Sequence, residues 1–203
     1  MRPTSLRFTS RERNLGLQWV AATVVGWAIG FFACEAVETF LATAFVDGLI
    51  IGTAIGIAQW LVLRRQLNPV GWWPVLSIVG FGLGKAAGDA LAPGLSGPVG
   101  HGLAGAVIGL SVGVTQWLVL RRHVEGTEWW VPANVMAWAV AWSIIGSVEG
   151  AAGAPIAWVY LAGAIGAGAA GLSTGFLLVS LIHRHGAALD RTAQDPAATT
   201  LSR

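Results

Sequence analysis

Residues 52–65 read GTAIGIAQWLVLRR and residues 109–122 read GLSVGVTQWLVLRR, so two stretches 57 residues apart agree at nine of fourteen positions. The segment from Gln59 to Arg65 is identical in both copies. A degraded third copy, GLSTGFLLVSLIHR at 171–184, keeps both glycines and the basic end but has lost the Gln-Trp pair. Self-similarity at a long period indicates a chain built from copies of one unit.

An apolar stretch upstream of each copy repeats as well. The stretches are VVGWAIG at 24–30, IVGFGLG at 78–84 and VMAWAVA at 135–141, with small residues at the same two places and an aromatic residue after the first. Each unit therefore consists of two apolar segments and a connecting loop. We expect tandem helical hairpins at about 17–65, 72–122 and 129–184.

Composition places these segments in a membrane. The chain has 203 residues, of which 55% are hydrophobic and 11% are charged, whereas a soluble domain carries roughly 25% charged residues. A lipid-embedded backbone must satisfy its own hydrogen bonds, so segments of this length are expected to be helices. The prediction is an all-α polytopic bundle of about six transmembrane helices. The expected helices are 17–38, 45–63, 73–91, 100–120, 130–149 and 156–182.

The distribution of basic residues predicts the orientation. Eleven of the twelve Lys and Arg residues fall on one side of a six-helix arrangement. Because short cytoplasmic loops are enriched in basic residues, that side is expected to be cytoplasmic. The prediction is a multi-pass inner-membrane protein with a basic cytoplasmic arm at 1–16, a membrane domain at 17–185 and a disordered cytoplasmic tail at 186–203.

Two groups of residues are expected to mark the cytoplasmic boundary. The paired arginines that end the second helices are interpreted as topology anchors: Arg64, Arg65, Arg121 and Arg122. The tryptophans near them are expected to form an interfacial aromatic belt: Trp19, Trp60, Trp72, Trp73, Trp117, Trp129 and Trp130.

Glycines spaced by four residues lie along the second helix of each unit. That spacing places them on one helix face, where a neighbouring backbone can approach closely. We expect these faces to pack within the bundle, against a second copy or against a larger membrane complex; a narrow pore lined by glycine backbones is the alternative. The residues concerned are Gly48, Gly52, Gly56, Gly105, Gly109, Gly113, Gly171 and Gly175.

Several ionisable residues lie within or beside the apolar segments, where a charge is costly and suggests a function. Lys85 lies about 18 Å from the start of its helix by the α-helical rise, and Asp89 follows one turn later, so the two can form an ion pair. Headgroup-level carboxylates and a structural ion pair are the alternatives to a polar pathway or vestibule. That vestibule is assigned Glu35, Lys85, Asp89, His101 and Glu149; Glu38 and Asp47 are the other carboxylates near these segments.

The remaining polar residues indicate packing rather than chemistry. Gln59 and Gln116 occupy equivalent positions, from which each is expected to form a hydrogen bond with a partner helix; a binding site is the alternative. The other histidines lie at the cytoplasmic boundary, and the single cysteine, Cys34, cannot form a metal site alone. The sequence contains no nucleophile elbow, phosphate loop or zinc-protease motif. We therefore expect no catalytic residues, no metal, no cofactor and no nucleic-acid partner.

The pattern Gly-x-x-x-Gly-x-x-Gln-Trp-Leu-Val-Leu-Arg, followed by Trp-Trp, resembles a loose group of small multi-pass bacterial membrane proteins built from copies of this hairpin. The match covers residues 19–184 and is clear in two units. The resemblance implies a bacterial inner-membrane location and a repeat architecture, but no substrate. Two hypotheses follow: a non-enzymatic structural or accessory membrane component, and a small channel or transporter for an ion or small polar solute.

Overall fold

The computed structural model describes residues 8–194 except 42, 68–69, 92–93 and 152, and it describes no side chains at 38–41 or 188–194. The carboxylate of Glu38 therefore lies outside the described residues. Within the described part of the chain, the all-helical fold predicted from the sequence is confirmed, with six long helices and one short 3₁₀ turn. They are α1 (Ser10–Leu41), α2 (Ala44–Leu63), α3 (Trp73–Leu91), α4 (Gly97–Leu120), η1 (Thr127–Trp129), α5 (Trp130–Glu149) and α6 (Ile156–Gln194).

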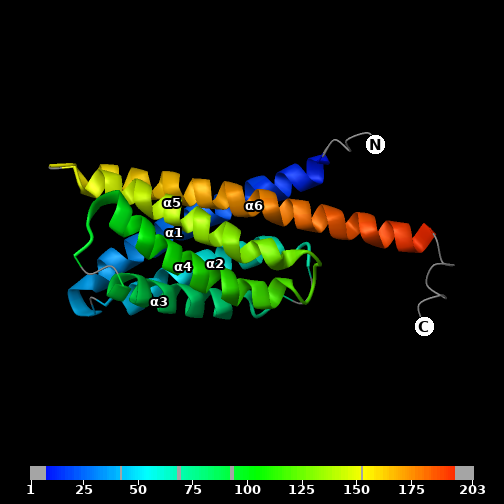
Figure 1. The fold of residues 1–203 in the computed structure, drawn as a ribbon, viewed down its shortest axis with the longest axis horizontal. Helices are drawn as coiled ribbons and strands as arrows, with labels where there is room; N and C mark the ends of the chain where they lie inside the picture. Colours follow the sequence, from blue (N-terminus) through cyan, green and yellow to red (C-terminus); the bar gives the residue numbers. More distant parts are fainter. Residues whose placement is uncertain (1–7, 42, 68–69, 92–93, 152, 195–203) are drawn as a thin grey trace.

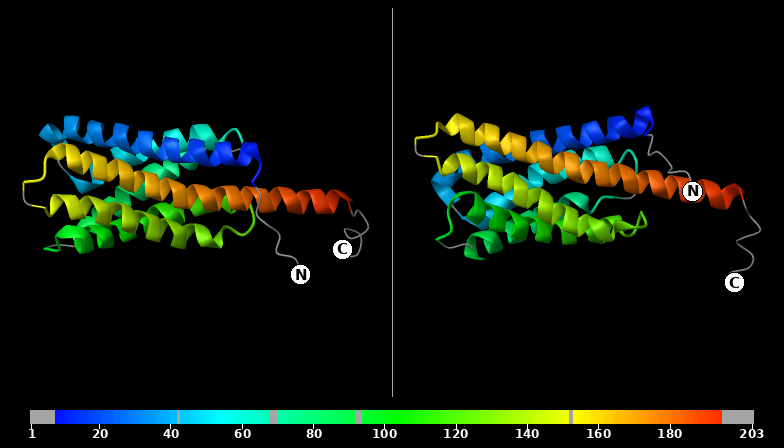
Figure 2. Two further views of the ribbon diagram at one scale, coloured as in Figure 1. Left: turned by 90° about the horizontal axis from the view of Figure 1, so that it is seen from above. Right: turned by 45° about the horizontal axis from the view of Figure 1, so that its top comes forward.

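The six helices run lengthwise beside one another and close into a ring. Each helix packs on its neighbours in sequence, and α6 packs on α1 to complete the circle. The start of α1 and the end of α6 lie at one end of the bundle, called here the terminal end, and α6 projects beyond the other helices there (Figure 1). Two further views show the same projection (Figure 2). The opposite end, where α5 is connected to α6, contains the site described below.

Five of the six helices are long and apolar enough to cross a membrane: α1, α2, α4, α5 and α6. Lys85, Asp89 and several glycines lower the hydropathy of α3, although it lies between α2 and α4 in the ring. Large apolar side chains face outward on every helix, for example Ile29 at 58%, Leu83 at 54% and Met136 at 64% exposure. This outer surface suits lipid and would be unusual in contact with water.

The two terminal helices are longer than expected. α1 begins at Ser10 because Thr9 and Glu12 form a reciprocal cap: the Thr9 N–H donates to Glu12 Oε2 at 2.7 Å, and the Glu12 N–H donates to Thr9 Oγ1 at 3.2 Å. The first helix was expected to begin at about residue 17, so the last residues of the predicted basic arm at 1–16 belong to α1. α6 likewise continues to Gln194, which contradicts the predicted disorder for residues 186–194.

Glycines lie where neighbouring helices approach most closely. A methyl group added at Gly52 would lie 2.9 Å from the Ser77 carbonyl oxygen, and one at Gly109 would overlap the backbone of Asn134. The helices could not keep this separation with larger side chains at these positions. The same holds at Gly48, Gly56 and Gly105, while Gly113, Gly171 and Gly175 are in slightly looser contact with α5 or α1.

Candidate functional site: a charged vestibule above a tryptophan layer

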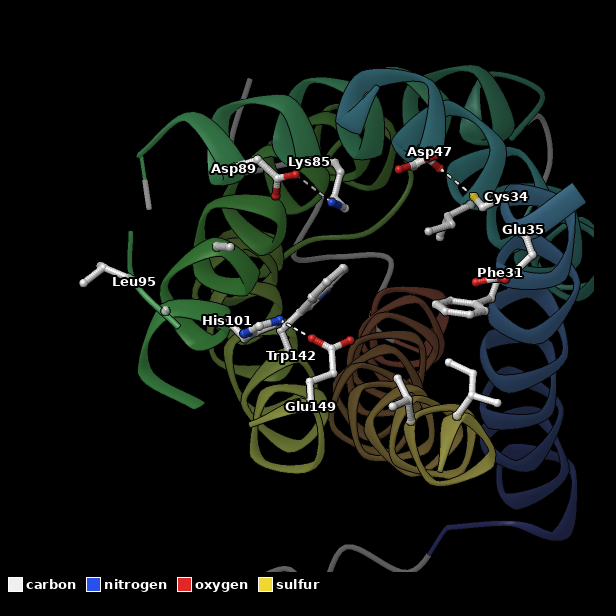
Figure 3. A pocket seen from close by; sticks show the side chains of 15 residues that line it. Phe31, Cys34, Glu35, Asp47, Lys85, Asp89, Leu95, His101, Trp142 and Glu149 are labelled. Carbon is white, nitrogen blue, oxygen red and sulfur yellow. Dashed lines mark hydrogen bonds and ion pairs between the residues drawn. The ribbon is translucent and has the colours of Figure 1, made fainter. Parts of the chain in front are cut away.

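A cavity of about 540 Å³ lies inside the ring at the end opposite the termini, and we call it the vestibule. Figure 3 shows it surrounded by helices, with charged side chains on opposite walls. Its volume falls in the range of small-molecule sites. All five residues of the sequence-predicted vestibule line it, joined by one further carboxylate: Glu35, Lys85, Asp89, His101, Glu149 and Asp47.

Lys85 holds a central place in the vestibule. Its Nζ lies 2.9 Å from Asp89 Oδ2, one turn further along α3, and 5.4 Å from the ring centroid of Trp142 on α5. The ammonium is thus held between a carboxylate and an aromatic face, an arrangement that stabilises a positive charge away from water. The side chain of Lys85 is only 16% exposed, which makes such compensation necessary.

His101 connects α4 to the end of α5. Its Nε2 lies 2.7 Å from Glu149 Oε2, and its Nδ1 lies 3.0 Å from the carbonyl oxygen of Gly97. The imidazole also stacks on Trp142, with ring centroids 6.4 Å apart. The sequence suggested that His101 could join both Asp89 and Glu149. Of these two carboxylates, His101 pairs with Glu149.

The opposite wall is formed by α1 and α2. Glu35 is exposed and Asp47 is half-buried, and no described side chain forms a salt bridge with either carboxylate. The Cys34 thiol donates to the backbone carbonyl of Asp47 at 3.7 Å and so joins the two helices. Beside them, Phe31 stacks on Trp27 with ring centroids 5.0 Å apart. This wall therefore combines two carboxylates with an aromatic surface.

Towards the terminal end, three tryptophans close the ring axis, and we call them the tryptophan layer. Trp19, Trp73 and Trp130 are fully buried and pack edge to face, with centroids 5.7, 6.1 and 6.0 Å apart. Their prediction as part of an interfacial belt is wrong, because they lie on the helix faces that meet at the centre. Trp72 and Trp129, by contrast, are 66% and 65% exposed, as a belt requires.

Each indole N–H of the tryptophan layer has a partner on a neighbouring helix. Trp73 donates to Gln59 Oε1 at 3.3 Å, and Trp130 donates to Gln116 Oε1 at 3.3 Å. Trp19 lies on α1, which packs on α6, and it donates to Thr174 Oγ1 of α6 at 3.0 Å. Buried indoles require such acceptors.

The two glutamines extend this network. Gln59 Nε2 donates to Thr23 Oγ1 at 3.1 Å, and Gln116 Nε2 donates to Ser77 Oγ at 3.1 Å. Gln116 Nε2 also lies 3.3 Å from Gln59 Oε1, which joins the two amides. No buried polar side-chain atom is without a hydrogen-bond partner among the described residues. The network therefore avoids the cost of unpaired polar groups in an apolar interior.

A small void lies beside the tryptophan layer. It measures about 10 Å³ and is lined by the buried amides together with Asn134 and Thr174. A single water needs roughly 10–15 Å³, so this space is at the lower limit for one molecule. The axis of the ring is consequently closed between the vestibule and the terminal end.

Arginines and histidines occupy the terminal end. Arg64 stacks over Trp60 at 4.7 Å, and Arg121 stacks over Trp117 at 4.5 Å, each just beyond the end of its helix. The neighbouring Arg65 and Arg122 are also exposed. At the start of α1, Glu12 Oε1 lies 2.6 Å from His183 Nδ1 of α6, and this contact joins the two helices. The paired arginines are therefore exposed where α2 and α4 end.

Sequence reasoning found the charged residues of the vestibule but missed its aromatic surfaces. Phe31 and Trp142 occupy the positions that align with Lys85 in the other two units, so the repeat contained the signal. Likewise, Trp19, Trp73 and Trp130 share one aligned position. Among the described side chains, no three His, Cys, Asp or Glu residues are grouped closely enough to hold a metal ion.

No protein-family model, curated protein or solved structure matches the chain.

Proposed function

We propose that this chain is a small bacterial inner-membrane channel or transporter, held closed, which receives a small polar or charged solute in the vestibule. The observation that carries the proposal is the convergence of charged side chains from α1 to α5 on one cavity inside a ring of apolar helices. Charged groups are expensive at membrane depth and are retained mainly where they bind or conduct. The proposed role is recognition and passage of a solute, with no enzymatic step.

The proposed orientation places the terminal end in the cytoplasm and the vestibule on the outer side. It rests on the arginines at the ends of α2 and α4, which lie at the same end of the bundle as the start of α1 and the end of α6. The three hairpins are proposed to be copies of one unit, because equivalent tryptophans from the three meet on the ring axis. The resemblance to repeated bacterial hairpin proteins fits the same proposal.

A second function is favoured by a different observation. The tryptophan layer closes the axis, and the large apolar surface of the ring is available to other membrane helices. These two features are sufficient for a structural or accessory component that packs on itself or on a larger complex. In that case the vestibule would be a surface cavity without a transport role.

Flux into liposomes separates the two functions. Purified protein reconstituted in liposomes is assayed for movement of protons, monovalent cations and small neutral solutes, beside empty liposomes and beside a Lys85→Ala/Asp89→Ala variant. The channel or transporter proposal expects flux above the empty liposomes that the double variant alters. Absence of flux for every solute would favour the accessory role, and co-purification of a membrane partner would then test it directly.

A further inference from the structure

The net charge of the vestibule follows from its hydrogen bonds. Lys85 and Asp89 form one ion pair and neutralise each other. His101 faces an acceptor at each ring nitrogen, the Gly97 carbonyl at 3.0 Å and Glu149 at 2.7 Å. A neutral imidazole has one N–H and can donate at only one of these positions.

An imidazolium at His101 would be balanced by the Glu149 carboxylate, and a neutral imidazole would leave that carboxylate unbalanced, so this contact adds no net positive charge to the vestibule. Glu35 and Asp47 on the opposite wall then remain as uncompensated negative charges among the described side chains. Apolar walls strengthen the field of such charges, so the cavity attracts cations and repels anions.

The vestibule already binds one cationic group, which belongs to the protein itself. The Lys85 ammonium lies over Trp142 and against Asp89, so a carboxylate and an aromatic face are arranged together for a positively charged nitrogen. Glu35 and Phe31 provide the same two kinds of group on the wall across the cavity (Figure 3). Aromatic faces combined with carboxylates are the usual surroundings of bound ammonium ions.

We propose that the ligand of the vestibule is a small organic cation, an ammonium group carrying an apolar substituent, with its charge near Glu35 and Asp47 and its apolar part against the aromatic rings. This inference rests on the proposed solute-binding function. A bare metal ion is a poorer fit, because no three metal-binding groups are grouped closely enough among the described residues. A cavity of about 540 Å³ also has room for more than an ion.

Three probes of one shape test the charge preference. Benzylamine, benzyl alcohol and benzoate are titrated at neutral pH into the full-length protein in detergent micelles and, as a blank, into empty micelles, with calorimetry as the readout. We expect benzylamine to bind at least about tenfold more tightly than either of the others. Equal binding of benzyl alcohol, or tighter binding of benzoate, would overturn the cation class while leaving a solute-binding vestibule in place.

Variants locate the binding site. The Glu35→Gln/Asp47→Asn double variant should weaken benzylamine at least about tenfold, while Glu125→Gln/Glu128→Gln removes two exposed carboxylates from the other end of the bundle and should leave it unchanged. Lys85→Met should tighten benzylamine binding, because it removes a competing positive charge and leaves the Asp89 carboxylate available to the ligand. Unchanged binding in both vestibule variants would overturn the proposal, and no binding of any probe would count against the vestibule itself as a binding site.

Discussion

The two halves of the ring solve the problem of polar groups in a membrane in opposite ways. In the terminal half, neutral amides, hydroxyls and indoles bond to one another in a closed network that leaves a void of about 10 Å³. In the other half, charged residues surround a cavity of about 540 Å³ and two carboxylates lack a described cationic partner. The terminal half is therefore a closely packed interior, whereas the vestibule is a charged cavity with room for a solute.

This contrast changes what a substitution should do in each half. Side chains of the terminal half fill space and satisfy buried donors, so removing one costs packing and a hydrogen bond together. Side chains of the vestibule are partly solvated, so removing one should alter binding much more than stability. The loss of stability on substitution should therefore decrease from the tryptophan layer to the vestibule.

Adjacent tryptophans give the largest expected difference. Trp73→Ala should lower the free energy of unfolding by roughly 3–5 kcal/mol, because it leaves a cavity in the tryptophan layer and removes the donor to Gln59. Trp72→Ala, one residue away and 66% exposed, is the matched control and should change it by less than about 0.5 kcal/mol. Denaturant unfolding in micelles measures both. Similar losses from the two variants would show that the layer is not the core of the fold.

Glycine contacts should give the next effect. Gly109→Ala places a methyl group against the backbone of Asn134 and forces α4 and α5 apart, at a cost of roughly 1–3 kcal/mol. Gly71→Ala has nothing within 4 Å of the added carbon and serves as the control. The same unfolding measurement applies, and a neutral Gly109→Ala would mean that the helices can separate without loss.

The sequence specified the fold more completely than the site. Length, hydropathy and the basic residues were sufficient for the helices, because the bilayer restricts the choice of structure. The burial of Trp19 could not be read from hydropathy, which gives an indole the same value at an interface as on a central axis. That distinction depends on the rotation of each helix, which only the closed ring determines. The helical start at Ser10, by contrast, was readable from the Thr9–Glu12 capping pattern.

The degraded third repeat shows how the loss of a glutamine acceptor can be compensated. Gln116→Leu leaves the Trp130 indole without an acceptor and should cost about 1–2 kcal/mol. The third unit has leucine at this aligned position, Leu178, and accepts from the Trp19 indole through Thr174, one turn earlier, where the second unit has Val112. Adding Val112→Thr to Gln116→Leu should therefore restore part of the lost stability. Val112→Thr alone is the control and should fold. If it folds and the double variant still shows no rescue, the units are not geometrically equivalent.

The smallest effect on stability is expected in the vestibule. Lys85→Met removes an ion pair whose carboxylate is 47% exposed, so Asp89 can be solvated and the loss should not exceed about 1 kcal/mol. The methionine retains most of the packing against Trp142, and an apolar residue at this depth is well tolerated in lipid. A loss as large as that of Trp73→Ala would place Lys85 among the residues that hold the ring together. A small loss, with flux or benzylamine binding altered in the same preparation, would separate the two halves by function as well as by packing, because only a solute-binding half can lose its selectivity while the fold remains intact.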